Sequence, residues 1–176
     1  MWTTSTTRPA PPAVRRSRWP RPHRTSARRP AIACAALLAG AAAVPAAADA
    51  PVFHPVPGNE AGALPFSEAV RVGGLLFLAG QLGNIPGTLQ LAPGGIAGET
   101  RQTMENIKAA LARHGATMED VVKCTVFLAD IDEWAAMNEV YVTYFPGHKP
   151  ARSAVGVSGL ALGARTEIEC IAAPVD

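Results

Sequence analysis

The most informative side chain for chemistry is a single arginine, Arg152, in a short apolar segment near the C-terminal end of the sequence. Residues 152–158 predict a β-strand, whose side chains alternate between two faces. One face, which we expect to belong to the core, carries Ser153, Val155 and Val157. The other face carries Arg152 followed only by small residues: Ala154, Gly156 and Ser158.

Small residues beside Arg152 leave room for a ligand or for a neighbouring chain. An arginine guanidinium is a planar fork that binds a carboxylate through two parallel hydrogen bonds. The pattern therefore allows a site for a small carboxylic acid, although spacing alone does not favour it over a structural role. The alternative is a structural ion pair between Arg152 and Glu167 or Glu169, which lie on the last predicted strand, residues 165–173.

Glu167 and Glu169 project from one face of that last strand, where a carboxylate could hold or deprotonate a water molecule. From the residues alone, a solvated edge of the sheet is the simpler interpretation of the two glutamates. His54, His114 and His148 lack the spacing of metal ligands. The sequence also contains no Walker A, G-x-G-x-x-G, G-x-S-x-G or H-E-x-x-H motif. We therefore expect chemistry without a metal or an organic cofactor, or simple binding of a small acid.

Charge is divided unevenly along the 176 residues. Residues 1–48 contain eight arginines and no acidic residue, and they end in an uncharged run of small apolar residues. This order predicts an export signal cleaved near Ala48, by the general secretory route or, with Arg28-Arg29, the twin-arginine route. We thus divide the chain into a leader, 1–48, and a domain, 49–176, that we expect in the periplasm. A misassigned start codon, with a cytoplasmic protein, is the alternative.

The domain carries eight basic and fourteen acidic residues, a net charge of −6. This balance gives no support to nucleic-acid binding, and we expect no membrane contact once the leader is removed. The two cysteines of the domain, Cys124 and Cys170, lie in apolar runs, where we expect buried free thiols. In an oxidising compartment the same two cysteines could pair.

Hydrophobic periodicity predicts an α+β domain with the element order β-β-β-α-β-α-β-β. A hairpin over 69–79 turns at Gly73-Gly74, and a short strand follows at 88–91. The first helix is expected at 97–114. The remaining elements are a strand at 121–129, a helix from Asp130 to about Phe145 with Glu133 completing a capping box, and the two strands already named. The second helix is expected to bury Trp134, Met137, Tyr141 and Tyr144.

Two helices can cover only one face of a sheet, yet some of the predicted strands are apolar on both faces. In the strand 121–129, Val122, Cys124, Val126 and Leu128 point one way, while Val121, Thr125, Phe127 and Ala129 point the other. Something else must bury the second face, and another copy of the chain is the simplest cover. The pattern therefore predicts a homo-oligomer.

Several short motifs, in a fixed order, resemble those of one known family. They are Leu64-Pro65-Phe66-Ser67-Glu68-Ala69-Val70, Leu78-Ala79-Gly80-Gln81, Glu99-Thr100-Arg101-Gln102 with Glu105-Asn106-Ile107-Lys108, Asp120-Val121-Val122-Lys123 with Thr125-Val126-Phe127-Leu128, Met137-Asn138-Glu139-Val140-Tyr141 with Phe145, and Pro150-Ala151-Arg152-Ser153 with Glu167-Ile168-Glu169. The match spans essentially all of residues 52–176. In these motifs the domain resembles the RidA family, also called YjgF/YER057c/UK114.

The resemblance implies a chorismate-mutase-like fold, with a mixed sheet and two helices on one face, assembled as a homotrimer with clefts between subunits. It implies hydrolysis of reactive 2-imino acids, or their enamine tautomers, to 2-oxo acids and ammonia without a cofactor. In that reaction Arg152 would grip the substrate carboxylate, and Glu167 would help to place the attacking water. Gly80 and Ala154 would line the pocket through their backbone, and Phe66 would be a further substrate-binding residue.

Three positions depart from the family pattern. The family often has Tyr where Phe66 stands, Cys where Ala154 stands and Glu where Gly156 stands. The missing hydroxyl and carboxylate motivate an alternative function, a non-catalytic trimer that binds small carboxylates in the same cleft. An endoribonuclease activity, sometimes attributed to the family, is disfavoured by the charge of −6 and by the lack of a basic or aromatic stripe.

Overall fold

The computed structural model describes residues 50–59 and 62–175, so the expected leader, 1–48, lies outside the described residues. Within the described part, no helix is long and apolar enough to cross a membrane. The strands and α-helices follow in the order β1 (Val52–Pro55), β2 (Ser67–Val72), β3 (Leu75–Leu78), β4 (Gln81–Leu82), α1 (Gly95–Arg113), β5 (Val121–Leu128), α2 (Trp134–Tyr141), β6 (Ala151–Gly156) and β7 (Thr166–Ala172).

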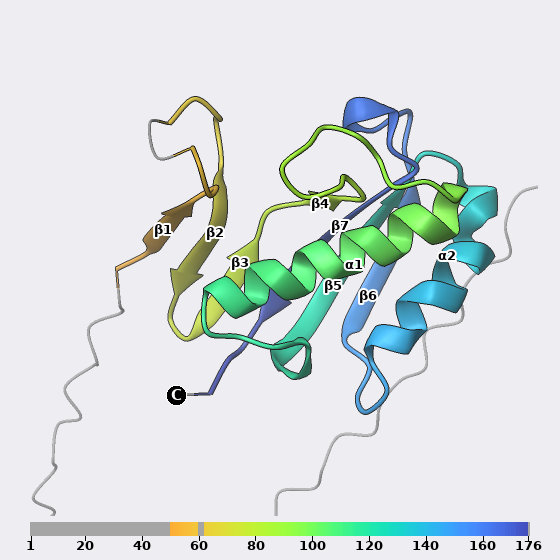
Figure 1. Ribbon diagram of the computed structural model, residues 1–176. Coiled ribbons are helices and arrows are strands. Elements are labelled where there is room, and N and C mark those ends of the chain that lie inside the picture. The colour runs from red at the N-terminus through yellow and green to blue at the C-terminus, as the bar shows by residue number, and fades with distance from the viewer. Residues whose placement is uncertain (1–49, 60–61, 176) are drawn as a thin grey trace, which may run out of the picture. The chain divides into compact units, whose positions relative to one another are not determined.

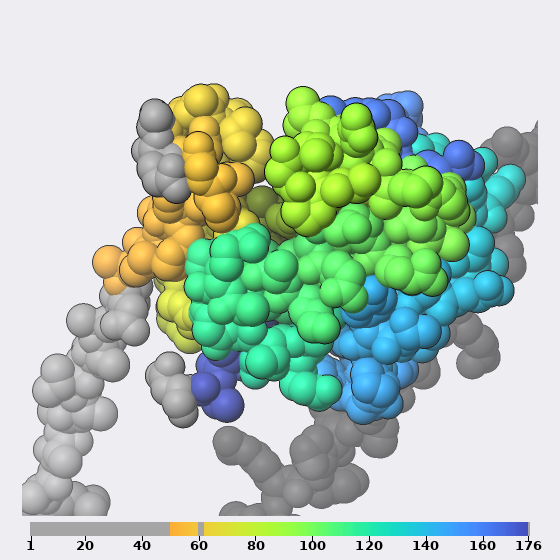
Figure 2. All heavy atoms as spheres, in the orientation of Figure 1, coloured from red at the N-terminus to blue at the C-terminus, as the bar shows by residue number. Residues whose placement is uncertain are grey.

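The strands form one mixed sheet in the order β1-β2-β3-β7-β5-β6, with the short β4 paired to β7. Strands β5 and β6 are parallel, and the other pairs are antiparallel. The parallel pair is connected through α2, because parallel neighbours need a crossover connection. Both α-helices lie against the same face of the sheet (Figure 1), and the space-filling view of that side shows α1 and α2 covering the strands (Figure 2). The predicted α+β class is confirmed.

The amino-terminal strands differ in part from the prediction. The hairpin is confirmed, because β2 and β3 join at Gly73 and Gly74, whose φ angles of 53° and 77° suit glycine. Strand β1, which the sequence did not signal, pairs with β2 at the edge of the sheet. The strand predicted after the hairpin, at residues 88–91, is absent. The strand that follows the hairpin is instead the short β4. An isolated bridge between Asn84 and Leu91 is the remaining pairing there.

Helix α1 buries the predicted row of side chains, which recur at three- and four-residue spacing: Ile96, Thr100, Met104, Ile107 and Leu111. The second predicted helix is instead three consecutive pieces, a 3-10 turn (Ile131–Glu133), α2 and a second 3-10 turn (Val142–Tyr144). The periodicity therefore predicted the helical region correctly but not its change of pitch.

The start of this region is capped only in part as predicted. The Asp130 carboxylate accepts a hydrogen bond from the Asp132 backbone nitrogen at 3.0 Å. The predicted capping-box role of Glu133 is wrong, because its carboxylate pairs with Arg165 ahead of β7. The backbone nitrogen of Arg165 in turn donates to the buried Glu99 carboxylate at 2.8 Å. These contacts connect the starts of α1, α2 and β7.

The sheet has one buried and one open face. In β5, Cys124, Val126 and Leu128 are fully buried on the helix side. A bulge between Val121 and Lys123 shifts the register, so that Val121 is buried like Cys124 and Val122 is exposed. The prediction that Val122 shares the row of Cys124 and that Val121 lies opposite is therefore wrong. On the face away from the helices several large apolar side chains stay exposed in the protomer: Phe53, Phe77, Val122 and Val155. An apolar face of this kind is what we expected another subunit to cover.

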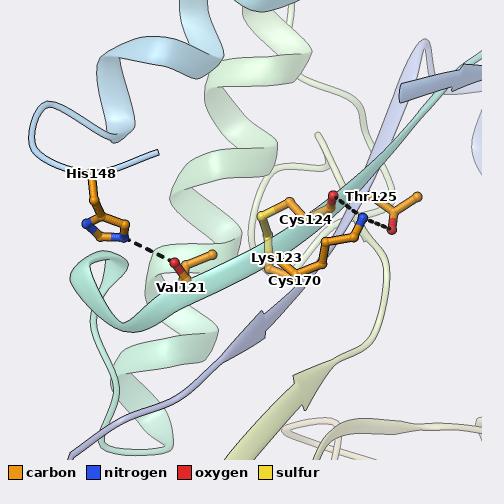
Figure 3. The surroundings of a disulfide bond; sticks show 6 residues. All are labelled: Val121, Lys123, Cys124, Thr125, His148 and Cys170. Atoms are coloured by element: carbon orange, nitrogen blue, oxygen red, sulfur yellow. Dashed lines mark hydrogen bonds between the residues drawn. A yellow bond between two sulfur atoms is a disulfide. The ribbon is translucent and has the colours of Figure 1, made fainter. Parts of the chain in front are cut away.

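Cys124 on β5 and Cys170 on β7 form a disulfide (Figure 3). The expectation of two free thiols is therefore wrong. The antiparallel register places the two cysteines directly opposite each other on the helix side, with Cα atoms 4.1 Å apart. Both residues are buried. Arg152 on β6 is the next residue in the same row across the sheet, beside Cys124.

Candidate functional site

Arg152 lies on β6, the strand at one edge of the sheet, and its side chain points to the helix side. Ala154 packs against the core on that side, whereas Ser153 and Val155 are exposed on the opposite face. The predicted faces of this strand are thus reversed. The small residues are needed because the helical region packs closely here: a Cβ at Gly156 would lie 3.1 Å from a side-chain carbon of Ile131.

The Arg152 guanidinium is held by neutral groups of α2. Its Nη1 donates to Asn138 Oδ1 at 2.5 Å. Its Cζ lies 4.8 Å from the centre of the Tyr141 ring and 5.8 Å from that of Trp134. Aromatic faces attract a cation without neutralising it. None of the ion pairs among the described residues involves Arg152, so the alternative of a structural ion pair with Glu167 or Glu169 is wrong for the protomer.

Arg152 therefore keeps most of its hydrogen-bonding capacity. A guanidinium has five N–H donors, and Asn138 takes the one hydrogen bond that the described residues make with it. The amide and the two rings fix the plane of the fork in advance. A carboxylate that reaches the remaining donors meets a cation whose orientation is already fixed.

A hollow of about 670 Å³ opens beside Arg152, between α2 and the start of β6. Its walls include Trp134, Tyr141, Val142 and Pro150. Burial raises the pKa of the Tyr141 phenol to about 12, against a smaller opposing effect of Arg152. The phenol is therefore protonated near neutral pH and cannot act as a base there.

Glu167 on β7 projects from the other face of the sheet. It stands in register with Phe127, which stands in register with Val155, and the side chains of this row point away from the helices. Arg152 belongs to the row of Cys124 and Cys170, which points toward them. Arg152 and Glu167, which we expected in one site, thus lie on opposite faces of the same protomer.

Gly80, just before β4, leaves the space that the Glu167 carboxylate occupies. A Cβ at position 80 would overlap Glu167 Oε1. Burial, and after it repulsion from Glu169, raises the pKa of the Glu167 carboxyl above its ordinary value. A half-buried carboxylate with a raised pKa is suited to taking a proton from water near neutral pH.

Phe66 precedes β2 and its side chain is half exposed. Together with Phe77 and Ala79 it lines a second hollow, of about 420 Å³. Ala79 adjoins Gly80 in the chain, so this hollow lies next to the Gly80 segment rather than beside Arg152. The five predicted site residues therefore fall into two groups, Arg152 with Ala154 and Gly80 with Glu167 and Phe66.

Sequence reasoning missed the residues of α2 that hold Arg152. Trp134, Asn138 and Tyr141 are spaced four and three residues apart, which places them on one side of a helix. We expected Trp134 in the core, but its side chain is 44% exposed in the hollow. A polar Asn138 between two aromatic residues at this spacing was the signal that could have identified them.

No group of three or more His, Cys, Asp or Glu residues in the described part of the chain is arranged to hold a metal ion. What the arrangement offers is a fixed cation at one edge of the sheet and a carboxylate of raised pKa on its open face.

Comparison with known proteins places the chain in a family. Residues 59–174 match the sequence model described as endoribonuclease L-PSP. A mouse (Mus musculus) protein named 2-iminobutanoate/2-iminopropanoate deaminase is 44% identical over 108 residues, which are 61% of this chain and 80% of the mouse protein. A RutC family protein of Pyrococcus horikoshii is 48% identical over 108 residues, 61% of this chain and 86% of that protein.

Solved structures agree with the sequence matches. RidA from the Antarctic bacterium Psychrobacter sp. PAMC 21119 superposes with a TM-score of 0.61 at 37% identity, covering 69% of this chain and 94% of that one. E. coli TdcF, crystallised with bound serine, gives a TM-score of 0.60 at 32% identity and covers 70% and 94%. From the fold, the ordered motifs and these matches, the chain belongs to the RidA (YjgF/YER057c/UK114) family, whose sequence model carries the endoribonuclease L-PSP description.

Proposed function

We propose that the protein hydrolyses reactive 2-imino acids, or their enamine tautomers, to 2-oxo acids and ammonia. The observation that carries the proposal is the Arg152 guanidinium, fixed by Asn138 and Tyr141 and without a carboxylate partner among the described residues. The names of mammalian relatives at 44–45% identity, 2-iminobutanoate/2-iminopropanoate deaminase, support the reaction class. The substrate is then a small acid whose carboxylate binds the open edge of Arg152.

We further infer that each site is completed between two copies of the chain, as expected for a homotrimer. Arg152 and Glu167 of one protomer face opposite ways, so one ligand can contact both groups only if they come from different protomers. The exposed apolar side chains on the open face, among them Phe77 and Val155, support such a contact. In this arrangement Arg152 of one protomer faces Gly80 and Glu167 of the partner subunit.

The chemistry follows from these positions. Arg152 binds the carboxylate of the imino acid and fixes the adjacent imine carbon. The partner subunit's Glu167, when ionised, accepts a proton from a water molecule as its oxygen bonds to that carbon. The C=N π electrons move to the nitrogen, which takes up the proton held by the partner's Glu167 and completes a carbinolamine. The partner's Glu167 then moves the hydroxyl proton to the nitrogen as the C–N bond breaks, so ammonia leaves and the carbonyl of the 2-oxo acid forms. Holding the reactants in this geometry can lower a barrier by about 7–11 kcal/mol at the extreme.

The direct test generates 2-iminopropanoate from alanine with an amino-acid oxidase and follows the loss of the imine with and without the protein. We expect the loss to accelerate in proportion to protein concentration. No acceleration would reject the proposal. RNA incubated with the same preparation is expected to stay intact. Cleavage that persists on further purification and is lost in Arg152→Ala would favour the endoribonuclease instead.

The second candidate is a non-catalytic protein that binds small carboxylates, and Phe66 favours it, because a phenylalanine supplies no hydroxyl to orient substrate or water. Calorimetry with 2-oxopropanoate, run beside the imine assay, separates the two functions. Binding without turnover supports the second candidate, and turnover rejects it.

Replacing Glu169 with glutamine is expected to shift the pH dependence of the reaction. The base must be ionised, so the rate rises with pH through the pKa of Glu167, which burial and Glu169 raise. The variant Glu169→Gln removes the like charge and lowers that pKa, so the acid limb of the kcat/KM profile moves to lower pH. A profile that does not move, or moves to higher pH, would contradict this role for Glu167.

Replacing Gly80 with alanine is expected to reduce activity while leaving the fold intact. The added Cβ would overlap the Glu167 carboxylate and displace it from its position. We expect kcat to fall by about tenfold or more, since a base that is misplaced by 1 Å or so loses efficiency. The matched control is Gly147→Ala, whose Cβ would meet its nearest neighbour, Glu119, at an ordinary 3.7 Å. Equal activity of the two variants would count against the position assigned to Glu167.

A further inference from the structure

The hollow beside Arg152 is much larger than the smallest imino acid requires. Its volume is about 670 Å³, in the range of pockets that hold ligands of drug size. A 2-iminopropanoate ion has six non-hydrogen atoms and would occupy a small part of it. The remaining space lies along α2 and is bounded mainly by apolar side chains, namely Trp134, Ala135, Tyr141, Val142 and Pro150.

Two of these side chains lack the burial that their size would usually give them. Trp134 is 44% and Val142 47% exposed, although both lie on the helical region that packs on the core. They are eight residues apart, close to two helical turns, and so line the same side of it. The hollow therefore combines an apolar wall that the protomer leaves uncovered with an oriented cation at its base.

The position of the cation limits where a bound substrate can extend. In a 2-imino acid the carboxylate, the imine carbon and the first side-chain carbon are consecutive atoms. Once Arg152 holds the carboxylate, the imine carbon must face the water and base, and the side chain must leave in another direction. The hollow along α2 is lined in part by Arg152 itself and provides that direction.

We propose that this hollow binds the substrate side chain, and that the protein prefers 2-imino acids with large apolar side chains, branched or aromatic, over 2-iminopropanoate. The proposal rests on the deaminase function proposed above and adds the substrate class to it. Apart from Arg152, the charged residues of the hollow are Glu139 and Lys149, whose opposite signs offset each other. The ammonium of Lys149 donates to the Phe145 carbonyl. The wall thus selects for apolar surface.

The experiment compares imines generated from phenylalanine, leucine and alanine, with kcat/KM measured for each. Apolar contacts in a pocket typically change discrimination by about 10–200-fold, so we expect the phenylalanine and leucine imines to exceed the alanine imine by at least about tenfold. The variants Val142→Asp and, separately, Trp134→Ala are expected to lower this ratio by about tenfold. The matched control Leu89→Asp, at an apolar position 77% exposed and outside the hollow, should leave the ratio unchanged.

Two results would overturn the proposal while the deaminase function stands. One is equal or higher kcat/KM for the alanine imine in the parent protein. The other is a change of molar mass by light scattering in Val142→Asp but not Leu89→Asp, which would show that a second copy packs on the apolar wall along α2 as well as facing Arg152, and leaves no room there for a substrate side chain. If no imine is hydrolysed, the deaminase function fails, and calorimetry then tests the hollow alone. Tighter binding of 2-oxo-3-phenylpropanoate than of 2-oxopropanoate supports it, and equal or weaker binding rejects it.

Discussion

Replacing Arg152 with lysine is expected to lower kcat/KM for imine hydrolysis at least about a hundredfold, and Arg152→Ala to lower it further. Lysine keeps the positive charge but loses the planar fork, so it cannot bind a carboxylate through two parallel hydrogen bonds or stack in the same way on the Tyr141 ring. A hundredfold loss corresponds to about 2.7 kcal/mol of transition-state stabilisation. The measurement is the initial rate of imine loss over a range of imine concentrations.

The control for this experiment separates the loss of a ligand contact from the loss of the fold. Arg152 lies at the sheet edge, half-buried, so we expect the thermal unfolding midpoint of Arg152→Lys to stay close to that of the parent. Arg101→Lys, at an exposed position of α1, makes the same chemical change away from the hollow and should keep full activity. Full activity in Arg152→Ala would reject the carboxylate-binding role.

Removing the disulfide is expected to have the largest effect on stability. In the double variant Cys124→Ala/Cys170→Ala, the unfolded chain regains the freedom of a loop whose ends are 46 residues apart. The loop-entropy model gives a loss of about 4 kcal/mol in the free energy of unfolding, and measured losses are typically about 2–4 kcal/mol. For a domain of this size we expect the unfolding midpoint to fall by roughly 10 °C.

Reductant provides the matched comparison for the disulfide. Dithiothreitol present during unfolding should lower the midpoint of the parent toward that of the double variant and leave the variant unchanged. A parent midpoint that does not respond to reductant, with a variant of equal stability, would contradict a stabilising role. Structural disulfides persist in oxidising compartments and are rare where thiols are kept reduced.

Local patterns predicted the elements of this fold better than their pairing. Met104, Ile107 and Leu111 recur at helical spacing because α1 buries one side on the sheet, and Gly73-Gly74 marks a turn that few other residues adopt. Both signals lie within a few residues of sequence. The bulge at Val121 and the pairing of Cys124 with Cys170 depend on the register between β5 and β7, which are far apart in the chain. Nothing within either strand specifies that register.

The candidate site shows the same limit. Residue type and the family motifs were enough to select Arg152 and Glu167. They were not enough to predict the face of the sheet on which each residue lies. In β6 the alternating rows each combine one polar residue with small or branched ones, so hydropathy does not identify the inner row. The close approach of Ile131 to Gly156 decides it, because only the small residues fit beneath the helical region. That approach is a tertiary contact and has no local signal.

The opposite directions of Arg152 and Glu167 have a consequence for mixtures of chains. If every catalytic centre takes its guanidinium from one chain and its carboxylate from another, Arg152→Ala and Glu167→Gln are inactive for complementary reasons. When the two defective chains are unfolded and refolded together, some centres receive the intact arginine of one and the intact glutamate of the other. Turnover in such a hybrid assembly, with neither parent active, would show that each catalytic centre is shared by two neighbouring chains.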